Sequence, residues 1–223
     1  MPIVRAFDTE TTGLFPKGSY DLNEGPWLLQ FSSVSYNTET NEFSVTSRYI
    51  KPPSYVDIPE SSTKIHGITR EKVDNEGCDI NHILEEFCKE SALMGKNDET
   101  IAHNLAFDTK VLNMERARNK IADTLFPVGK KYICTMKKSK NIVGSRGVDK
   151  DGKYYIKYPK LVELHQRLFP DEIIPNSLHD SLVDTLVCIR CYILMIYHID
   201  INEKNSEFKK IYNKHCNMGV ASM

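Results

Sequence analysis

Short apolar runs separated by polar connections predict three strands near the start of the chain. Residues 2–8 form a short apolar run that suits a buried strand. Residues 27–36 and 43–50 show the composition of two further strands, and the polar segment 37–42 joins them. A hairpin is the natural pairing of these two strands, because their connection is short.

Apolar residues at helical spacing predict helices in the middle of the chain. From Asp79, a plausible N-cap, Ile80, Ile83, Leu84 and Phe87 share one face, so this helix should cover one face of the sheet. Further along, the pattern predicts a strand at 100–103, a helix from Asn104, a strand at 132–134, a loop at 144–153 and a short helix at 161–169.

A long, mostly buried helix is predicted to start around Asn176 and Ser177. Ser177 and Asp180 provide an S-x-x-D capping pattern, and apolar residues continue one face beyond it. We expect one α/β domain over residues 1–200, whose leading strands are antiparallel. Residues 201–223 form a C-terminal tail, in which the spacing of three apolar residues allows a short docking helix of the same domain.

Composition places the chain among ordinary globular proteins, since 40% of its residues are hydrophobic and 26% are charged. Only Met1 and Pro2 precede the first apolar run, so we expect no signal peptide and an intracellular location. That location would be the cytoplasm, or a nucleus-like replication compartment in a viral or eukaryotic source. The CxxC pair Cys188 and Cys191 lies inside an apolar helical pattern, which favours core packing over metal or redox work.

Charge is unevenly distributed, although the net charge is only −1. Between Lys130 and Lys160 there are ten Lys or Arg residues against two Asp residues, a local balance of +8. Such a segment could guide a phosphate backbone toward an acidic site. A solvated lysine-rich loop explains the same charges equally well.

Asp8 and Glu10 are two residues apart on an extended chain, so both carboxylates project from the same side of the strand. Two negative charges at that separation favour a bound cation. Mg²⁺ and Mn²⁺ prefer oxygen ligands and need few protein carboxylates. An Asp-x-Glu pair taken alone favours a solvated turn over a metal site.

Three acidic motifs and one further segment occur in order along the chain. The first is Phe7 to Leu14 (FDTETTGL), the second Ala102 to Asp108 (AHNLAFD) and the third His179 to Asp184 (HDSLVD), while Ile65 to Thr69 (IHGIT) lies between the first two. Together they resemble the DnaQ-like (DEDDh) 3′–5′ exonucleases over residues 3–198, and most closely the bacterial DNA polymerase III epsilon-type proofreading exonucleases.

The resemblance implies a ribonuclease H-like fold, with a mixed sheet of about five strands and helices on both faces. It also implies that Asp8, Glu10, Asp108 and Asp184 hold two Mg²⁺ or Mn²⁺ ions. Asp8 would bridge the two ions. Glu10 and Asp184 would complete the coordination of the ion on the nucleophile side, and Asp108 would bind the other ion either directly or through a water molecule.

His179 is the general base that the resemblance implies. The predicted helix start places His179 in the first helical turn, about 140° around the axis from Asp184. Two residues so arranged cannot chelate one ion side by side, so we expect separate roles for them.

Several further residues match family positions that contact the substrate. Leu14 would wedge against the terminal base, with burial in the core as the alternative. His66 could instead cap a helix or order a loop, and His103 could pack the second motif. The implied substrate-binding residues are Thr9, Thr11, Thr12, Gly13, Leu14, Ile65, His66 and Asn104.

We therefore predict a 3′–5′ exonuclease that acts on single-stranded or frayed DNA, in proofreading, replication or repair, alone or with a separate polymerase or replication partner. An exoribonuclease of the same chemistry is one alternative, because a metal centre acts on the phosphate and not on the 2′-hydroxyl. A catalytically idle nucleic-acid-binding accessory subunit is the other.

Overall fold

A five-stranded mixed sheet forms the centre of the protein, seen here in a computed structural model that describes residues 2–18, 21–175 and 178–216. The strand order is β3-β2-β1-β4-β5. β1 pairs antiparallel with β2, which pairs antiparallel with β3, whereas β4 and β5 continue the sheet parallel to β1. The strands are β1 (Ile3–Thr11), β2 (Leu28–Asn37), β3 (Phe43–Tyr49), β4 (Glu99–Ala102) and β5 (Lys131–Cys134). The predicted hairpin and the mixed sheet of about five strands are confirmed.

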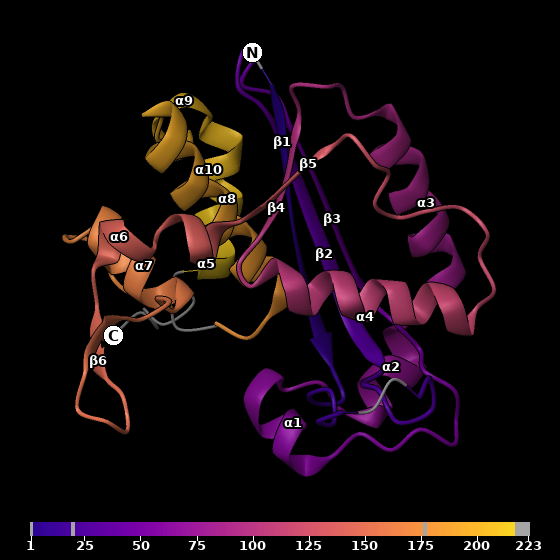
Figure 1. The fold of residues 1–223 in the computed structure, drawn as a ribbon. Helices are drawn as coiled ribbons and strands as arrows, with labels where there is room; N and C mark the ends of the chain where they lie inside the picture. The colour runs from indigo at the N-terminus through magenta and orange to yellow at the C-terminus, as the bar shows by residue number, and fades with distance from the viewer. Residues whose placement is uncertain (1, 19–20, 176–177, 217–223) are drawn as a thin grey trace, which may run out of the picture.

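Helices cover both faces of the sheet, as predicted (Figure 1). On one side lie α3 (Ile80–Leu93) and α4 (Leu105–Arg118), and on the other lie α8 (Ser181–Tyr197), α9 (Ile201–Lys204) and α10 (Ser206–Cys216). The remaining described helices are α1 (Glu60–His66), α2 (Arg70–Glu76), α5 (Thr135–Lys138), α6 (Lys140–Val143) and α7 (Leu161–Leu168). None of the helices within the described ranges has the length and apolar character that a bilayer crossing needs.

Alternation along β1 divides its side chains between two cores. Val4 and Ala6 belong to the cluster under α8, whereas Phe7 belongs to the cluster under α3 and α4. Because successive strand residues point to opposite faces, Asp8 and Glu10 continue the face that carries α8. The hydrophobic pattern of this strand thus fixes which helix the two acids meet.

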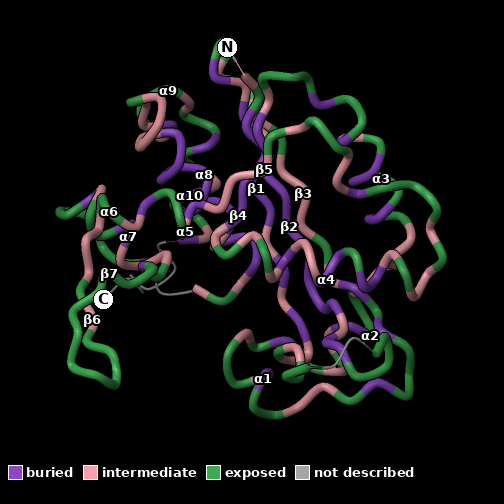
Figure 2. The backbone as a smooth tube through the Cα atoms, viewed as in Figure 1, coloured by how far each residue is buried: buried purple, intermediate pink, exposed green. Residues whose placement is uncertain are grey.

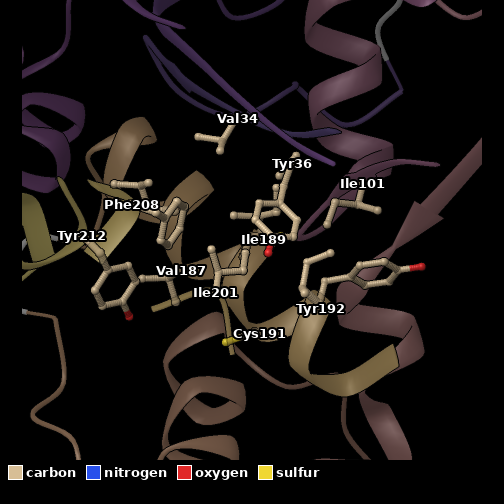
Figure 3. Packing of buried hydrophobic residues seen from close by; sticks show 14 of the residues in the cluster. Val34, Tyr36, Ile101, Val187, Ile189, Cys191, Tyr192, Ile201, Phe208 and Tyr212 are labelled. Carbon is tan, nitrogen blue, oxygen red and sulfur yellow. The ribbon is translucent and has the colours of Figure 1, made fainter. Parts of the chain in front are cut away.

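The C-terminal helices pack against α8 (Figure 3). Phe208 and Tyr212 of α10 are buried in the same cluster as Val187 of α8 and Ile201 of α9. Residues 217–223 of the predicted tail lie outside the described residues, and the boundary at residue 200 stays a prediction. Cys188 and Cys191 are buried in this cluster, as predicted, and neither forms a disulfide.

Two predicted element bounds are wrong. β1 runs on to Thr11 because its polar residues still pair with β2, as in Asp8 with Ser32 and Glu10 with Gln30. α8 starts at Ser181, because the Asp180 side chain accepts hydrogen bonds from the amides of Leu182 and Val183 and so acts as the N-cap. The proposed start at 176–177 lies outside the described residues.

The segment 144–153, predicted to be a loop, contains a strand. β6 (Arg146–Val148) pairs antiparallel with β7 (Tyr154–Ile156) in a separate two-stranded ribbon. Turn residues such as Gly144 and Gly152 led to the loop prediction, but they flank and close this ribbon, since both have positive φ.

Candidate active site

Two carboxylates enter the site from β1. Asp8 and Glu10 are half-buried on the α8 side of the sheet, opposite Ser32 and Gln30 of β2. The register shifts between Glu10 and Thr11, where the strand leaves the sheet. Both acids therefore sit near the carboxyl end of β1, where β4 and α4 also meet.

The third carboxylate comes from the first turn of α4. Asn104 turns the chain at φ 81° between β4 and α4, which brings Asp108 beside β1, the parallel neighbour of β4. Asp108 is buried, and its Oδ1 accepts a 2.8 Å hydrogen bond from the hydroxyl of Thr9. This bond fixes the orientation of the Asp108 carboxylate.

Asp184, the fourth carboxylate, comes from the first turn of α8. Its Oδ2 accepts a 3.2 Å hydrogen bond from the amide of His179, and its buried Oδ1 has no partner among the described residues. His179 precedes the helix, with φ 84° and an exposed side chain. The prediction that His179 lies in the first helical turn is wrong, since Asp180 is the cap.

Glu10, His179 and Asp184 each offer a ligand atom, and these atoms lie within 4.8 Å of one another. The prediction that His179 and Asp184 are placed too far apart to chelate one ion side by side is therefore also wrong. The 140° separation applies only to two residues on one helix. The left-handed turn at His179 folds the chain back on the helix start instead.

The four acids share one electrostatic environment. Burial raises the pKa of Asp8 well above its usual range, and the charges of Asp108, Asp184 and Glu10 raise it further. Burial, with the charges of Asp184 and Asp108, raises the pKa of Glu10 to about 9. The pKa values of Asp108 and Asp184 rise to about 7, chiefly through burial. Residues from three separate elements thus repel one another at one place.

This donor set suits hard divalent cations. Carboxylate oxygens are the ligands that Mg²⁺ and Mn²⁺ prefer, and cations would offset the mutual repulsion. The unpartnered Oδ1 of Asp184 supplies an independent indication, since buried polar atoms are rarely left without a partner. Asp8, Glu10, Asp108 and Asp184 therefore fit a metal centre.

The segment after β1 is held by hydrogen bonds. The Thr11 hydroxyl donates to the carbonyl of Gly13, and the Thr12 hydroxyl accepts from the amide of Trp27. Leu14 is 82% exposed, so its alternative placement in the core is wrong. Thr9 differs from the other predicted substrate residues, because its side chain is buried against Asp108.

Ile65 and His66 lie at the end of α1, close to this segment. Ile65 is 59% exposed. His66 Nδ1 accepts from the amide of Ile68, and its Nε2 lies 3.2 Å from the carbonyl oxygen of Thr11. Both ring nitrogens are thus engaged within the protein, which matches the alternative that His66 orders a loop.

His103 and Asn104 occupy the turn between β4 and α4. His103 Nδ1 lies 3.0 Å from the Thr135 hydroxyl, and its Nε2 lies 3.0 Å from the carbonyl oxygen of Pro159. His103 therefore packs the second motif, as predicted. The Asn104 side chain forms no capping bond, and its backbone conformation sets the turn.

A pocket of about 420 Å³ opens beside the acids. Its walls come from the three acidic motifs, from α5, and from the start of α7 with the segment before it. The lining residues are Asp8, His103, Met136, Tyr158, Pro159, Lys160, Leu161, Val162, Leu178, His179 and Asp184. This pocket gives a substrate access to the carboxylates of Asp8 and Asp184.

Sequence reasoning missed the polar contacts that join β2 to the start of α8. The Gln30 side chain accepts from the Ser181 amide at 3.2 Å and donates to Asp180 at 3.3 Å. The hydroxyls of Ser32 and Ser181 lie 2.7 Å apart. These bonds hold the helix that carries Asp184 against the strand beside β1.

The sequence profile of the RNase T exonuclease family matches residues 6–192, most of the chain. No curated protein matches the sequence. Among solved structures, Exonuclease I from Methylocaldum szegediense has a TM-score of 0.62 and 17% identity, with coverage of 91% of this chain and 42% of that chain. E. coli Exonuclease I in complex with a dT13 oligonucleotide has a TM-score of 0.63 and 14% identity, with coverage of 100% and 47%.

The nuclease domain of 3′hExo, a DEDDh family member bound to rAMP, has a TM-score of 0.63 and 18% identity, with coverage of 89% of this chain and 94% of that domain. The chain spans less than half the length of the two Exonuclease I chains. At these identities the likeness shows a shared ribonuclease H-like exonuclease fold. With the profile match, it establishes that the chain belongs to the RNase T exonuclease family, the DnaQ-like exonucleases.

Proposed function

We propose that the protein is a metal-dependent 3′–5′ exonuclease that releases nucleotides from the 3′ end of single-stranded or frayed DNA. One observation carries the proposal: four carboxylates from three separate segments of the chain lie close enough to repel one another, and two of them, Asp8 and Asp184, line a pocket together with His179. Each of these residues also occupies a motif position of the family. The domain of residues 1–200, with its tail at 201–223, is proposed as the unit that carries the site.

Asp8, Glu10, Asp108 and Asp184 would hold two Mg²⁺ or Mn²⁺ ions. When bound, such ions would stabilise the attacking and leaving oxygens of an in-line displacement at phosphorus. His179 would accept a proton from the attacking water as general base, since its ring is exposed beside Glu10 and Asp184.

The 3′-terminal nucleotide would contact the segment that leaves β1. Leu14 and Ile65 are exposed apolar side chains available to a base. The proposed substrate contacts are Thr11, Thr12, Gly13, Leu14, Ile65, His66 and Asn104. Thr9 would act indirectly, because its hydroxyl holds Asp108.

DNA is the proposed substrate because the first motif and the H-G-I-T segment resemble those of proofreading exonucleases. An exoribonuclease is the alternative, and the two differ only in the sugar that is accepted. A role in replication, repair or proofreading, and a separate polymerase partner, stay predictions from the resemblance. The proposed exonuclease activity depends neither on such a role nor on such a partner.

The test is degradation of 5′-labelled 20-mers of DNA and RNA with Mg²⁺, Mn²⁺ or EDTA. We expect a ladder shortened from the 3′ end that disappears in EDTA. Asp8→Asn should abolish the ladder while the circular dichroism spectrum stays native, because the substitution removes both a ligand and a source of repulsion. Asp57→Asn, an exposed acid outside the site, is the matched control. Full activity of Asp8→Asn would refute the metal assignment. If the wild type degraded neither DNA nor RNA, the alternative of a catalytically idle nucleic-acid-binding subunit would be favoured instead.

A further inference from the structure

The β6–β7 hairpin projects from the body of the protein (Figure 1). Its two strands pair only with each other within the described chain, and residues 148–158 are exposed throughout (Figure 2). The turn is ordered by Asp149, whose carboxylate accepts from the amides of Asp151 and Lys153 at 3.0 and 2.8 Å. The hairpin is therefore a formed element that contributes almost nothing to the core.

Large apolar and aromatic side chains lie on this exposed hairpin. Tyr154 is 74% exposed, Tyr158 53% and Val148 56%. Isolated exposed apolar residues are common, but several on one projecting element indicate a surface that meets a partner. The aromatic rings indicate a single-stranded nucleic acid as the partner, because such rings can stack on unpaired bases.

The basic residues of the stretch 130–160 divide into two groups. Lys130 donates to the backbone carbonyls of Ala92 and Met94, and Lys131 lies 3.9 Å from Glu99, so both serve the amino end of β5. The other eight form no ion pair within the part of the chain that the structure describes; they are Lys137, Lys138, Lys140, Arg146, Lys150, Lys153, Lys157 and Lys160. Four of the eight, Arg146, Lys150, Lys153 and Lys157, lie on the hairpin or at its base, and their positive charges complement a phosphate backbone.

The base of the hairpin borders the active site. Lys157 donates its amide to the carbonyl of Ser145 at 2.8 Å, which closes the base. The next residues, Tyr158, Pro159 and Lys160, line the same pocket as Asp8 and Asp184. The hydrogen bond between His103 and the Pro159 carbonyl ties this wall to the second motif. A strand that leaves the pocket along this wall would reach the hairpin directly.

We propose that the β6–β7 hairpin, with the basic residues around it, is a binding arm for the single strand that runs 5′ of the scissile phosphodiester. This inference rests on the proposed exonuclease function and deepens it. The carboxylates and their cations would hold only the phosphate that is cleaved, and the arm provides positive charge and stacking surfaces for the nucleotides that precede it. Substrates long enough to reach the arm therefore bind more tightly than a dinucleotide.

The experiment measures KM for 20-mers of thymidine and of uridine and for the matching dinucleotides. In Tyr154→Ala we expect KM for the 20-mer to rise about 10-fold, because one base loses its stacking partner. In Lys150→Gln/Lys153→Gln the dependence of KM on salt should become shallower, by about one unit in the log–log slope. In both variants KM and kcat for the dinucleotide should stay at wild-type values. The triple variant Lys89→Gln/Lys96→Gln/Lys204→Gln, in exposed lysines outside the arm, is the charge control.

A wild-type KM for the 20-mer in both arm variants would overturn the proposal. An equal loss on the 20-mer and the dinucleotide would also overturn it, because it would show damage to the site itself. Comparison of thymidine with uridine polymers shows which sugar the bound strand carries. Should the wild type cleave neither polymer, the proposed function fails, and binding of labelled 20-mers in EDTA then tests the arm separately: unchanged affinity in Tyr154→Ala would exclude it.

Discussion

At the scale of single residues, His179 combines an unusual backbone conformation with the role of general base. Its φ of 84° is uncommon for residues other than glycine, and Asn, Asp and His adopt such angles more often than the rest. Asn is therefore the substitution that keeps the turn while removing the imidazole. We predict that His179→Asn lowers kcat by a factor of about 10²–10⁴ with little change in KM, because only the proton acceptor is lost. Steady-state kinetics on a labelled DNA 20-mer measures both constants.

His198→Asn is the matched control, since His198 also has a positive φ, at the end of α8. It should behave as the wild type. If His179→Asn retained wild-type turnover, another group would have to accept the proton, and the assignment of the base would be wrong.

The residues that carry charge in the site could be predicted from sequence, whereas those that position them could not. Asp8, Asp108 and Asp184 stand in motifs that a reader of the sequence recognises. The contact of Gln30 with Ser181 joins residues 151 positions apart, and Gln30 belongs to no motif. Pairs of this kind depend on which strand and helix meet, and this information emerges only from the folded chain.

At the scale of elements, the polar end of β1 and the N-cap of α8 explain the two wrong boundaries. β1 extends through Thr11 because backbone pairing with β2 does not require apolar side chains. The S-x-x-D pattern predicted a helix start at 176–177 with Asp180 inside the first turn. The contacts of Asp180 with Gln30 and with the amides of Leu182 and Val183 instead make Asp180 the N-cap. Because α8 starts after Asp180, His179 precedes the helix and is not part of its first turn.

The helix α10 offers a test of whether the tail belongs to the domain. Phe208 is fully buried between β3 and the C-terminal helices, where the centroids of its ring and of the Phe43 ring lie 5.4 Å apart. We predict that Phe208→Ala lowers the free energy of unfolding by about 3–5 kcal/mol, because a large buried side chain is removed. Urea unfolding followed by circular dichroism measures this change.

Lys210→Ala, on the exposed side of the same helix, should change the stability by less than about 0.5 kcal/mol. Equal stability of Phe208→Ala and Lys210→Ala would show that the fold does not depend on α10. Such a result would support a boundary near residue 200.

At the scale of the whole molecule, the acidic site opposes folding unless cations are present. The carboxyl pKa values in the unfolded chain lie near 4, and in the folded protein those of Asp108 and Asp184 rise to about 7 and that of Glu10 to about 9. At pH values between about 4 and 9, the folded protein therefore binds more protons than the unfolded chain. Its stability is then fully retained below about pH 4 and falls as the pH rises through 7 to 9.

We therefore predict that, in EDTA, the midpoint of thermal unfolding falls as the pH is raised from 5 to 9. Mg²⁺ should raise the midpoint most at the high end of this range, because cations bind the ionised carboxylates of the folded protein only. At pH 8 the Asp8→Asn variant should unfold at a higher temperature than the wild type in EDTA and gain less from Mg²⁺, since one repelling charge and one ligand are absent. Differential scanning calorimetry measures each midpoint. A midpoint in EDTA that stays constant or rises between pH 5 and 9 would mean that the four acids do not share a pocket, because separated carboxylates would titrate near 4 in both states.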